Sequence, residues 1–487
     1  MVTLPGTAGE DYLLINHLMS LGMNSARINC AHDDHITWKK MIDNIHLSNN
    51  KLAKNCKIMM DLGGPKLRTG SMLPGPQIIH IKPEKDVTGI IINPAKVWIA
   101  PPDFPLPADG MGVHIPVSEQ WYSKIKRGDS LHLTDTRGKK IKIIIEGKKG
   151  GGRLGLCFNS AYVSSGTELK LFKPDNTEKL THQVGELLPL AQYISLKTGD
   201  YLILHKDEKP GEPAQYDEKG KLLNHAHISC TLPEIFNDVN TGEPIFFDDG
   251  KIEGIIEDAS EEKLLIKITH AKDTGSKLRQ DKGINLPDSD LKVSGLTEKD
   301  KKDLEFVTAN ADAVNLSFVN DENNVQQLMD ELSKYETQIG IILKIETQKG
   351  FKNLPRIILK AMQTFPIGVM IARGDLAIET GWKNFASIQD EILRICESAH
   401  IPDVWATQVL ENLTKKGVPS RAEITDAAMS QRAECVMLNK GAYIEKAVKM
   451  LDKILRRMQR FQKKKETMLP KLDEADSLFL SHNKFNI

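Results

Sequence analysis

The sequence predicts an α/β fold, a TIM (β/α)8 barrel with a large β-rich lid domain inserted after barrel strand 3. Three observations lead to this fold class. Strand-like and helix-like segments alternate over residues 1–70, the alternation stops between 71 and 287, and it returns from 288 to about 465. Repeated strand and helix units indicate parallel strands, and three strands before the insertion with five after it complete a barrel.

The first part of the barrel reads as strand, helix, strand, helix, strand. Its strands are short apolar runs, MVTL (1–4), SARINC (25–30) and KIMMDL (57–62). Helical spacing of apolar residues predicts the helices at 9–21 and 35–48, and Gly22 ends the first of them. This pattern is typical of two successive βαβ units.

The inserted segment, 71–287, is rich in Gly, Pro and Lys and contains short alternating runs such as KIKIII and YLILHK. Such runs predict β-hairpins in one or two small barrels. Two stretches within it resemble each other weakly, RGDSLHLTDTRGKKIKI near 127–143 and TGEPIFFDDGKIEGII near 241–256. We therefore expect a duplicated barrel-like unit.

The remaining barrel strands follow the insertion, each ahead of a helix-length segment. They are predicted at 313–317, 341–344, 369–372, 404–406 and 435–438. A last amphipathic helix over 443–464 presents an apolar stripe that is typical of core packing. Residues 466–487 form a polar C-terminal tail.

Composition excludes several classes of protein. The chain of 487 residues has 65 basic and 65 acidic side chains, so its total charge indicates neither nucleic acid nor an anionic membrane as a partner. The six cysteines are scattered, which argues against a zinc site or a disulfide framework and for a reducing compartment. No run is long enough to predict a membrane span, and no signal-like segment precedes the first strand. We expect a cytoplasmic protein, or an organellar one if a targeting segment is missing.

Polar residues stand at the predicted carboxyl ends of the strands, where TIM barrels carry their active sites. In chain order they are Arg27 and Asn29, Asp61, Ser317, Lys344 and Glu346, Arg373 and Asp375, Thr407 and Asn439. A single polar strand end, such as Lys344 with Glu346, is most simply a local ion pair. A consecutive series of such ends indicates a site.

The residue types point to metal and phosphate chemistry. Glu346 and Asp375 are the carboxylates best placed to bind Mg²⁺ or Mn²⁺. Arg27, Arg68, Lys344 and Arg373 supply cations for phosphate oxygens, although Arg373 with Asp375 is also consistent with a structural ion pair. Gly374 allows close approach of its backbone N–H to a substrate carboxylate. This equipment favours phosphoryl transfer.

Eight ordered motifs resemble those of the pyruvate kinase family. They are RINCAHDD (27–34), DLGGPKLRTG (61–70), DDGKIEG (248–254), KGINLP (282–287), LTEKDKKDL (296–304), LKIETQKG (343–350), MIARGDLAIE (370–379) and WATQVLENLTKKGVPSRAEITDAA (405–428). The resemblance implies a Mg²⁺-dependent transfer of phosphate from phosphoenolpyruvate to ADP, giving pyruvate and ATP. It also implies that the insertion is a lid over the barrel mouth.

The resemblance also implies roles for single residues. Lys344 would neutralise the transferring phosphoryl group, and Glu346 and Asp375 would hold Mg²⁺. Arg27, supported by Arg68, would contact phosphoryl and nucleotide phosphates. Further roles fall on Thr407, beside the enolate that is protonated, and on Lys282, which would contact the nucleotide.

The chain departs from the family pattern at four places. Asn29 and Asp61 of the family's K⁺ site remain, but Ala31 replaces a serine and Lys66 replaces a glutamate. A fixed ammonium can replace a mobile cation, so we expect no requirement for K⁺. The lid is about twice the usual length, the C-terminal effector domain is missing, and residues 439–443 differ from the usual block after strand eight. A homodimer through the barrel is the expected assembly.

Two other functions remain open. The same barrel is compatible with a different enzyme acting on phosphoenolpyruvate or a keto-acid enolate, with its acceptor selected by the enlarged lid. A non-catalytic scaffold whose lid binds protein or nucleic acid is supported only by the basic pairs Lys139-Lys140 and Lys148-Lys149, which are more often solvated turns.

Overall fold

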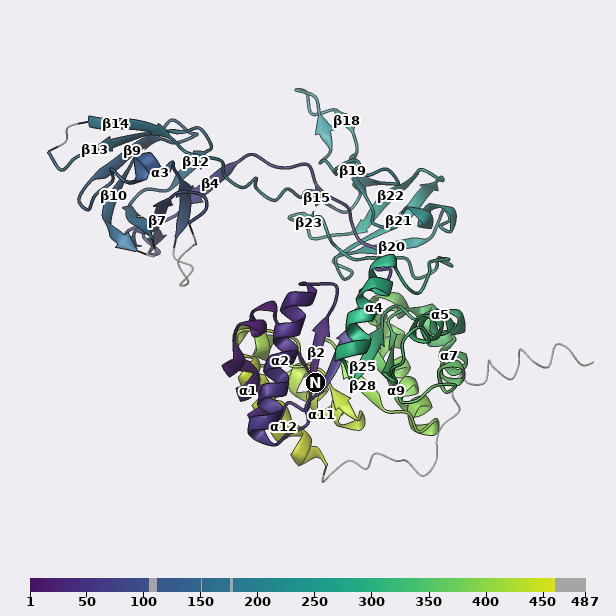
Figure 1. Cartoon of the computed structure of the whole chain (residues 1–487). Coiled ribbons are helices and arrows are strands. Elements are labelled where there is room, and N and C mark those ends of the chain that lie inside the picture. The colour runs from purple at the N-terminus through teal and green to yellow at the C-terminus, as the bar shows by residue number, and fades with distance from the viewer. Residues whose placement is uncertain (105–111, 150, 176–177, 460–487) are drawn as a thin grey trace, which may run out of the picture. The chain divides into compact units, whose positions relative to one another are not determined.

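The structure is a computed structural model that describes residues 1–104, 112–149, 151–175 and 178–459 (Figure 1). The chain forms two compact units, one made of 1–71 with the chain from 194 onward, the other of 72–193. The predicted tail, 466–487, and the end of the predicted last helix, 460–464, lie outside the described residues.

The expected parallel barrel is confirmed, with the insertion after its third strand. Its eight strands are hydrogen-bonded in chain order: β1 (Val2–Thr3), β2 (Ser25–Asn29), β3 (Lys57–Asp61), β25 (Ala313–Leu316), β26 (Gly340–Ile345), β27 (Ile367–Ala372), β28 (Asp403–Ala406) and β29 (Cys435–Val436). A parallel bridge between Val2 and Leu438 joins the first and last strands. The Thr3 N–H donates to the Leu438 carbonyl at 2.9 Å, which closes the ring.

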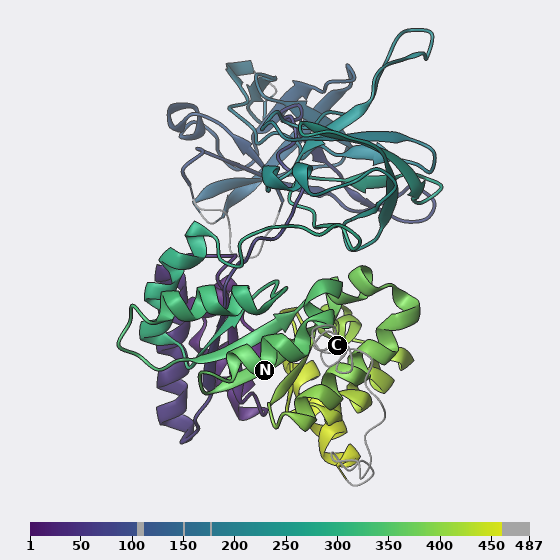
Figure 2. The same ribbon diagram turned by 90° about the vertical axis from the view of Figure 1, so that its right-hand side faces the viewer.

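Helices surround the strands, as the two ribbon views show (Figures 1 and 2). They are α1 (Tyr12–Ser20), α2 (His35–Leu52), α4 (Glu298–Asn310), α5 (Glu322–Leu332), α6 (Gln348–Lys352), α7 (Leu354–Ala361), α8 (Arg373–Thr380), α9 (Trp382–Ser398), α10 (Glu411–Lys416), α11 (Arg421–Met429) and α12 (Ile444–Met458). The predicted helix at 9–21 is shorter because a 3₁₀ turn occupies 6–9 and the Asp11 side chain caps α1.

The barrel core lies mainly between strands and helices. Every residue of β26 and β27 is buried, as expected for strands covered on both faces. Inside the ring, a small cluster that includes Ile342, Met370 and Met437 fills the lower layers. The polar ends of the strands therefore project from a rigid, packed support.

The second part of the insertion, residues 194–287, forms what we call the second β domain. Its six-stranded sheet has the order β19 (Ala226–Ser229), β16 (Tyr201–His205), β22 (Lys263–His270), β21 (Ile252–Ala259), β20 (Pro244–Phe247) and β24 (Ile284–Asn285), with smaller pairs β15 (Ile194–Leu196) with β23 (Ser276–Leu278) and β17 (Gln215–Tyr216) with β18 (Leu222–Asn224). A short 3₁₀ helix, η2 (Pro233–Asn237), follows β19. The exit strand contacts the barrel, since Asn285 Nδ2 donates to Glu379 Oε1 of α8 at 2.9 Å.

Residues 72–193 form the first β domain, with its own apolar core. Its seven-stranded sheet has the order β14 (Glu178–Gln183), β13 (Glu168–Phe172), β9 (Ser130–Thr134), β10 (Lys140–Lys149), β11 (Gly152–Cys157), β7 (Ala95–Ala100) and β8 (Val113–Pro116), with smaller pairs β12 (Ala161–Ser164) with β4 (Ile78–Ile81) and β5 (Glu84–Lys85) with β6 (Ile91–Asn93). A short helix, α3 (Glu119–Tyr122), follows β8.

The two β domains have the same topology. Strand for strand in chain order, β4, β7, β8, β9, β10, β11, β12 and β13 correspond to β15, β16, β19, β20, β21, β22, β23 and β24. In both, one parallel pair (β7 with β8, β16 with β19) lies at the edge of an otherwise antiparallel sheet. A single helical turn follows the parallel strand in each. The structure thus supports the duplication expected from sequence.

The chain enters and leaves the first β domain through two neighbouring segments. The Gly75 N–H donates to the Leu190 carbonyl at 3.2 Å, and the Leu190 N–H donates to the Pro76 carbonyl at 3.1 Å. A Cβ atom on Gly75 would lie 2.5 Å from the Leu190 carbonyl oxygen, so this close approach requires glycine.

All six cysteines are free. Within the described ranges, the structure contains no helix whose length and apolar character would let it cross a membrane.

Candidate active site

Lys344 occupies the centre of a buried charge cluster at the carboxyl end of the barrel. Its Nζ atom lies 2.7 Å from Ser317 Oγ, 2.9 Å from Glu346 Oε1 and 3.2 Å from Asp61 Oδ2. The residue is only 8% exposed. Burial alone would lower the pKa of Lys344, but the charges of Glu346 and Asp61 raise it above its ordinary value. The ammonium is therefore charged at neutral pH.

Asp61 joins Lys344 to a second cation, Arg27. The Arg27 Nε atom donates to Asp61 Oδ1 at 3.0 Å and Nη2 donates to Oδ2 at 2.6 Å, a two-point pairing that fixes the guanidinium. Asn315 Nδ2 donates to the same carboxylate at 2.6 Å. Burial opposes ionisation of Asp61, yet Arg27 and Lys344 hold its pKa below the ordinary value. The carboxylate thus keeps two cations oriented.

Glu346 and Asp375 form the acidic part of the cluster. Burial raises the pKa of Glu346, and the negative charge of Asp375 adds to this rise although Lys344 opposes it. Burial also opposes ionisation of Asp375, but Lys66 lowers its pKa. The Lys66 Nζ atom lies 3.0 Å and 2.8 Å from the two Asp375 oxygens. Two neighbouring carboxyls, one buried at Glu346 and one partly buried at Asp375, favour a bound cation.

The donor set fits a hard divalent ion with few protein ligands. Glu346 and Asp375 offer carboxylate oxygens, which Mg²⁺ and Mn²⁺ prefer. Among the described residues, no group of three or more His, Cys, Asp and Glu side chains is arranged to hold a metal. A metal bound here would therefore take its other oxygens from water and substrate, as Mg²⁺ commonly does at phosphate sites.

Arg373 is turned toward α11 and β28. Its guanidinium pairs with both oxygens of Asp426, and Nη2 donates to the Thr407 carbonyl at 2.6 Å. It also lies over the Trp405 ring, 4.5 Å from the centroid. These contacts position the end of β28, and substrate contact by Arg373, which would require the Asp426 pair to open, stays a prediction.

Thr407 and Gly374 line a cavity of about 230 Å³. Thr407 has a left-handed backbone, with φ of 65°, and its buried Oγ1 has no hydrogen-bond partner among the described residues. A Cβ on Gly374 would lie 3.7 Å from that oxygen, so the two residues face each other. A buried hydroxyl without a partner is costly, which marks this cavity as a place for a polar ligand.

Arg68 lies on the segment by which the chain leaves the barrel after β3, and Lys282 lies on the segment by which it returns, where a bridge joins Arg68 to Gly283. Arg68 Nη1 donates to the Asp281 carbonyl at 3.2 Å, and Lys282 Nζ lies 3.0 Å from Asp248 Oδ1. No contact joins either residue to the Lys344 cluster within the described part of the chain. Both side chains remain partly exposed, so their predicted contacts with phosphates stay predictions.

Asn29 and Asn439 lie at another side of the barrel end. With His32 and Arg27 they line a cavity of about 290 Å³. The Asn29 Oδ1 atom accepts from the Ala31 N–H at 3.0 Å, and Asn439 Nδ2 donates to Glu411 at 3.3 Å. The predicted series of polar strand ends therefore divides into three groups, and Lys344 belongs to the largest.

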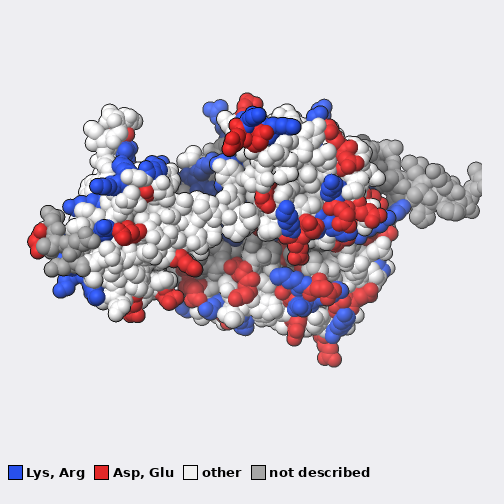
Figure 3. All heavy atoms as spheres, turned by 90° about the horizontal axis from the view of Figure 1, so that it is seen from above, with Lys and Arg blue, Asp and Glu red and all other residues white. Residues whose placement is uncertain are grey.

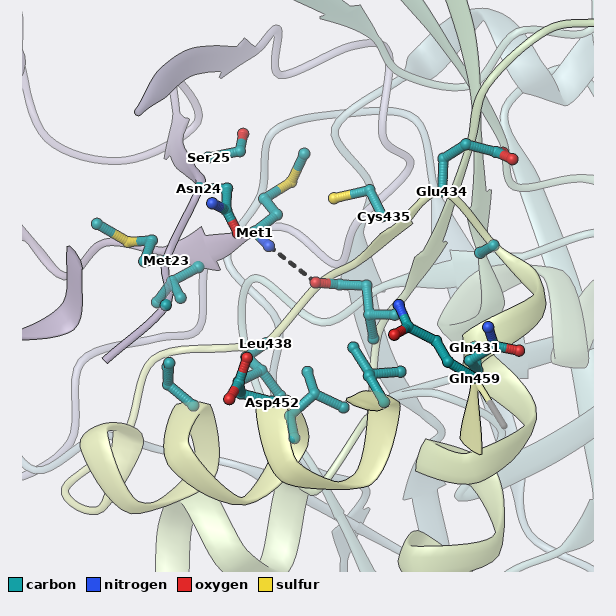
Figure 4. A pocket seen from close by; sticks show the side chains of 17 residues that line it. Met1, Met23, Asn24, Ser25, Gln431, Glu434, Cys435, Leu438, Asp452 and Gln459 are labelled. Atoms are coloured by element: carbon teal, nitrogen blue, oxygen red, sulfur yellow. Dashed lines mark hydrogen bonds between the residues drawn. The ribbon is translucent and has the colours of Figure 1, made fainter. Parts of the chain in front are cut away.

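A further cavity, of about 430 Å³, opens at the opposite end of the strands (Figure 4). Met1, Ser25 and Cys435 lie at the starts of β1, β2 and β29, and Asp452 of α12 faces them. TIM-barrel sites form at the carboxyl ends of the strands, so we do not assign this cavity to catalysis.

The sequence reasoning missed three residues that shape the site. Asn315 interrupts the apolar run AVNL, and this fully buried amide was a readable signal. Asp426 lies on α11 and Glu379 on α8, where carboxylates are normally solvated. Neither position carried a signal of its contact.

Comparison with known proteins agrees with this geometry. Residues 1–95 and 189–448 match the family described as pyruvate kinase, barrel domain. The match omits most of the first β domain and includes the second.

Proteins that are similar to this chain in sequence or in structure are named pyruvate kinases. The chain is 33% identical over 223 residues to a pyruvate kinase of Methanocaldococcus jannaschii, covering 44% of this chain and 48% of that protein. It is 30% identical over 268 residues to a pyruvate kinase of Staphylococcus aureus, covering 54% and 43%. The chain thus spans less than half the length of these curated relatives. A crystal structure of a pyruvate kinase from Cryptosporidium parvum superposes with a TM-score of 0.62 at 20% identity, covering 95% of this chain and 69% of the other, which shows the shared fold.

Proposed function

Because the chain belongs to the pyruvate kinase family, we propose that it transfers the phosphoryl group of phosphoenolpyruvate to ADP. The bond from phosphorus to the enol oxygen breaks, and a bond from phosphorus to a terminal oxygen of ADP forms. The enolate left behind takes one proton on carbon and becomes pyruvate, so no oxidant or reductant is needed. The observation that carries the proposal is the buried Lys344 ammonium, oriented by Asp61, Glu346 and Ser317.

Lys344 and Arg27 supply positive charge to the transferring group. Both are fixed by Asp61, so little reorganisation is needed when negative charge shifts between donor and acceptor oxygens. Such positioning and neutralisation provide most of the catalysis of phosphoryl transfer.

Glu346 and Asp375 would hold the divalent ion. Mg²⁺ bound there would neutralise phosphate and enolate oxygens. Lys344 now shares Glu346, and Lys66 shares Asp375, so each carboxylate keeps a lysine partner beside the ion. The lysines limit the net charge of the filled site.

Gly374 and Thr407 would contact the carboxylate and enolate part of the substrate. The Gly374 N–H, in the first turn of α8, would bind the substrate carboxylate. The unpartnered Thr407 hydroxyl would hold the water that protonates the enolate carbon. Lys282 of the second β domain, with Arg68 on the neighbouring segment after β3, would contact the nucleotide, and closure of that domain would exclude water from the transfer.

Lys66 replaces the monovalent cation in this proposal. Its ammonium is held by both Asp375 oxygens and lies over the Phe318 ring, 5.5 Å from the centroid. A tethered charge needs no K⁺ from solution. We expect turnover that requires Mg²⁺ or Mn²⁺ and is independent of K⁺.

The test mixes the protein with phosphoenolpyruvate, ADP and Mg²⁺ in a Na⁺ buffer free of K⁺, and follows pyruvate and ATP together. Equimolar products, reduced at least about 100-fold in Lys344→Met, are expected, since one preorganised charge commonly contributes that much. Lys349→Met, a change at an exposed lysine paired with Asp290, is the matched control.

Other outcomes would redirect the assignment. Pyruvate without ATP would favour a different enolate enzyme on the same barrel. No turnover with K⁺ added and with other nucleoside diphosphates would refute the proposed reaction. Light scattering would test the expected homodimer.

A further inference from the structure

The first β domain repeats the topology of the second without its charged hairpin pair. In the second domain, Asp248 follows β20 and pairs with Lys282, just ahead of β24. The registers of the matching strands place Thr134 and Thr167 at these positions in the first domain. The copy therefore lacks the ion pair that we assign to nucleotide contact beside the barrel.

The loop between β9 and β10 in the first domain is held by hydrogen bonds within the loop itself. The Asp135 carboxylate accepts from the N–H groups of Arg137 and Lys139 at 3.0 Å and 2.9 Å, and from the Arg137 guanidinium at 2.8 Å. In the second domain the matching loop approaches the barrel, because a Cβ on Gly250 would lie 2.8 Å from Ile378 of α8. The first domain is therefore not built as a second catalytic lid.

One face of the first domain's sheet instead carries positive charge. Lys142, His132 and Lys170 lie side by side across β10, β9 and β13. The matching positions of the second domain are Glu253, Phe246 and Asn285. The first domain thus carries two lysines where the second carries an acidic and an amide side chain. Because these positions share one face, their charges act together.

The same face encloses a cavity of about 460 Å³ whose lining includes Lys140, Lys142, Lys170 and Phe172. Within the described chain, the ammonium groups of Lys140 and Lys142 have no ion-pair or hydrogen-bond partner. Lys170 pairs with the exposed Glu168 at 3.3 Å, a contact that solvent screens. The face is therefore cationic, with two lysines available to an anion.

Aromatic rings accompany these lysines. The rings of His132 and Phe172 lie 4.4 Å apart between centroids, tilted by 36°. Burial and the neighbouring Lys142 lower the pKa of His132, so at neutral pH its ring is uncharged. Ile144, 41% exposed, lies on the same face beside them. Cations beside partly exposed rings are the combination that binds phosphates together with bases.

The first β domain has an excess of basic residues that the neutral charge of the whole chain does not reveal. Residues 72–193 contain sixteen Lys and Arg against twelve Asp and Glu, although the complete chain is neutral. Figure 3 shows several Lys and Arg side chains along the upper edge of the left-hand body, with Asp and Glu side chains elsewhere on it. The excess favours an anionic partner for this domain.

We propose that this face of the first β domain binds the phosphate and base of a nucleotide, either free or as the unit of a single-stranded nucleic acid. The lysines contact phosphate, and the Phe172 and His132 rings contact the base. The site is separate from the proposed catalytic cluster and belongs to the other compact unit.

Two probes test the assignment on the full chain in EDTA: fluorescein-labelled U12 RNA, and ADP carrying a fluorescent ribose label. Lys142→Glu introduces the residue type that the second domain carries at the same place, so the fold tolerates it. We expect it to weaken at least one probe about tenfold, since a phosphate contact is lost and a repulsion is added. Lys85→Glu, the same charge change on the β5–β6 hairpin, should leave both affinities unchanged.

The pattern of loss identifies the source of the ligand. Weakening of labelled ADP indicates a free nucleotide, whereas weakening of RNA alone indicates a strand, with a salt slope of roughly −2 for three lysine contacts. If Lys142→Glu alters neither affinity, or if Lys85→Glu lowers them equally, the proposal is wrong. Phosphotransferase turnover should be unchanged in Lys142→Glu, so this result is independent of the proposed reaction.

Discussion

Replacing Glu379 by glutamine should make the barrel more stable than that of the wild-type protein, and this difference should grow as pH rises. Glu379 lies on α8 and is 9% exposed, and its carboxyl group accepts hydrogen bonds from the Asn285 side chain and the Gln348 backbone. Burial raises the pKa of Glu379 to about 7, with the hydrogen bonds opposing and the charge of Asp375 adding to the rise. Glutamine keeps the shape and the accepting oxygen but cannot ionise.

The sign and size follow from linkage. Between pH 4.5 and about 7 the folded protein binds more protons at Glu379 than the unfolded chain does. The stabilising contribution of the protonated carboxyl is therefore complete below pH 4.5 and is lost as pH rises through 7. A difference of about 2.5 pKa units corresponds to about 3 kcal/mol. Glu379→Gln should match wild type near pH 4.5 and exceed it by up to about 3 kcal/mol at pH 8.

Urea unfolding followed by tryptophan fluorescence measures this difference at each pH. Comparison of variant with wild type cancels the contribution of the first β domain, which the substitution does not touch. Glu305→Gln, an exposed change on α4, is the control and should give no pH-dependent difference. A difference between Glu379→Gln and wild type that is constant from pH 5 to 8 would refute the reasoning.

Three further substitutions test other parts of the structure. Lys66→Met leaves Asp375 without its ammonium, so turnover in Na⁺ buffer should fall about 100-fold and recover partly with K⁺; equal rates would contradict the role of the lysine. Asp426→Ala removes the partner of the Arg373 guanidinium; because Asp426 is 26% exposed, we expect a loss of about 3 kcal/mol in chemical denaturation, the low end of the cost of breaking a buried pair. Gly75→Ala forces a methyl group against the Leu190 carbonyl, which should push the two paired segments apart. Faster proteolysis of the segment around residue 75 should reveal their separation.

The barrel was predictable because its signals are local and periodic. Short buried runs such as 341–344 can be distinguished from helices because they are too short to be helical. The alternation of side chains along a strand predicted Lys344 and Glu346 on the same side of β26, as observed. The helix bounds were less accurate, since capping by Asp11 shortened the first helix. Side-chain direction was the harder question, because Arg373 stands at a strand end and yet turns to a helix that follows much later in the chain.

The inserted domains show where reading a single sequence fails. Their hairpins differ in loop length, with seven residues between the paired Leu133 and Ile141 but four between Phe247 and Ile252. Such an offset weakens any alignment of the two stretches. Strand pairing preserves the correspondence because the backbone hydrogen bonds do not depend on side-chain identity.

The paired segments at Gly75 and Leu190 bring the two ends of the first β domain together. The chain that leaves the barrel has to bridge the same short gap whether or not the domain is there. Because the entropy of closing a loop grows slowly with its length, a folded body can be added at such a point at small cost to its host. At this position another domain whose ends lie close together, such as a fluorescent reporter, can therefore replace residues 76–189. The order and pairing of the barrel strands would stay unchanged.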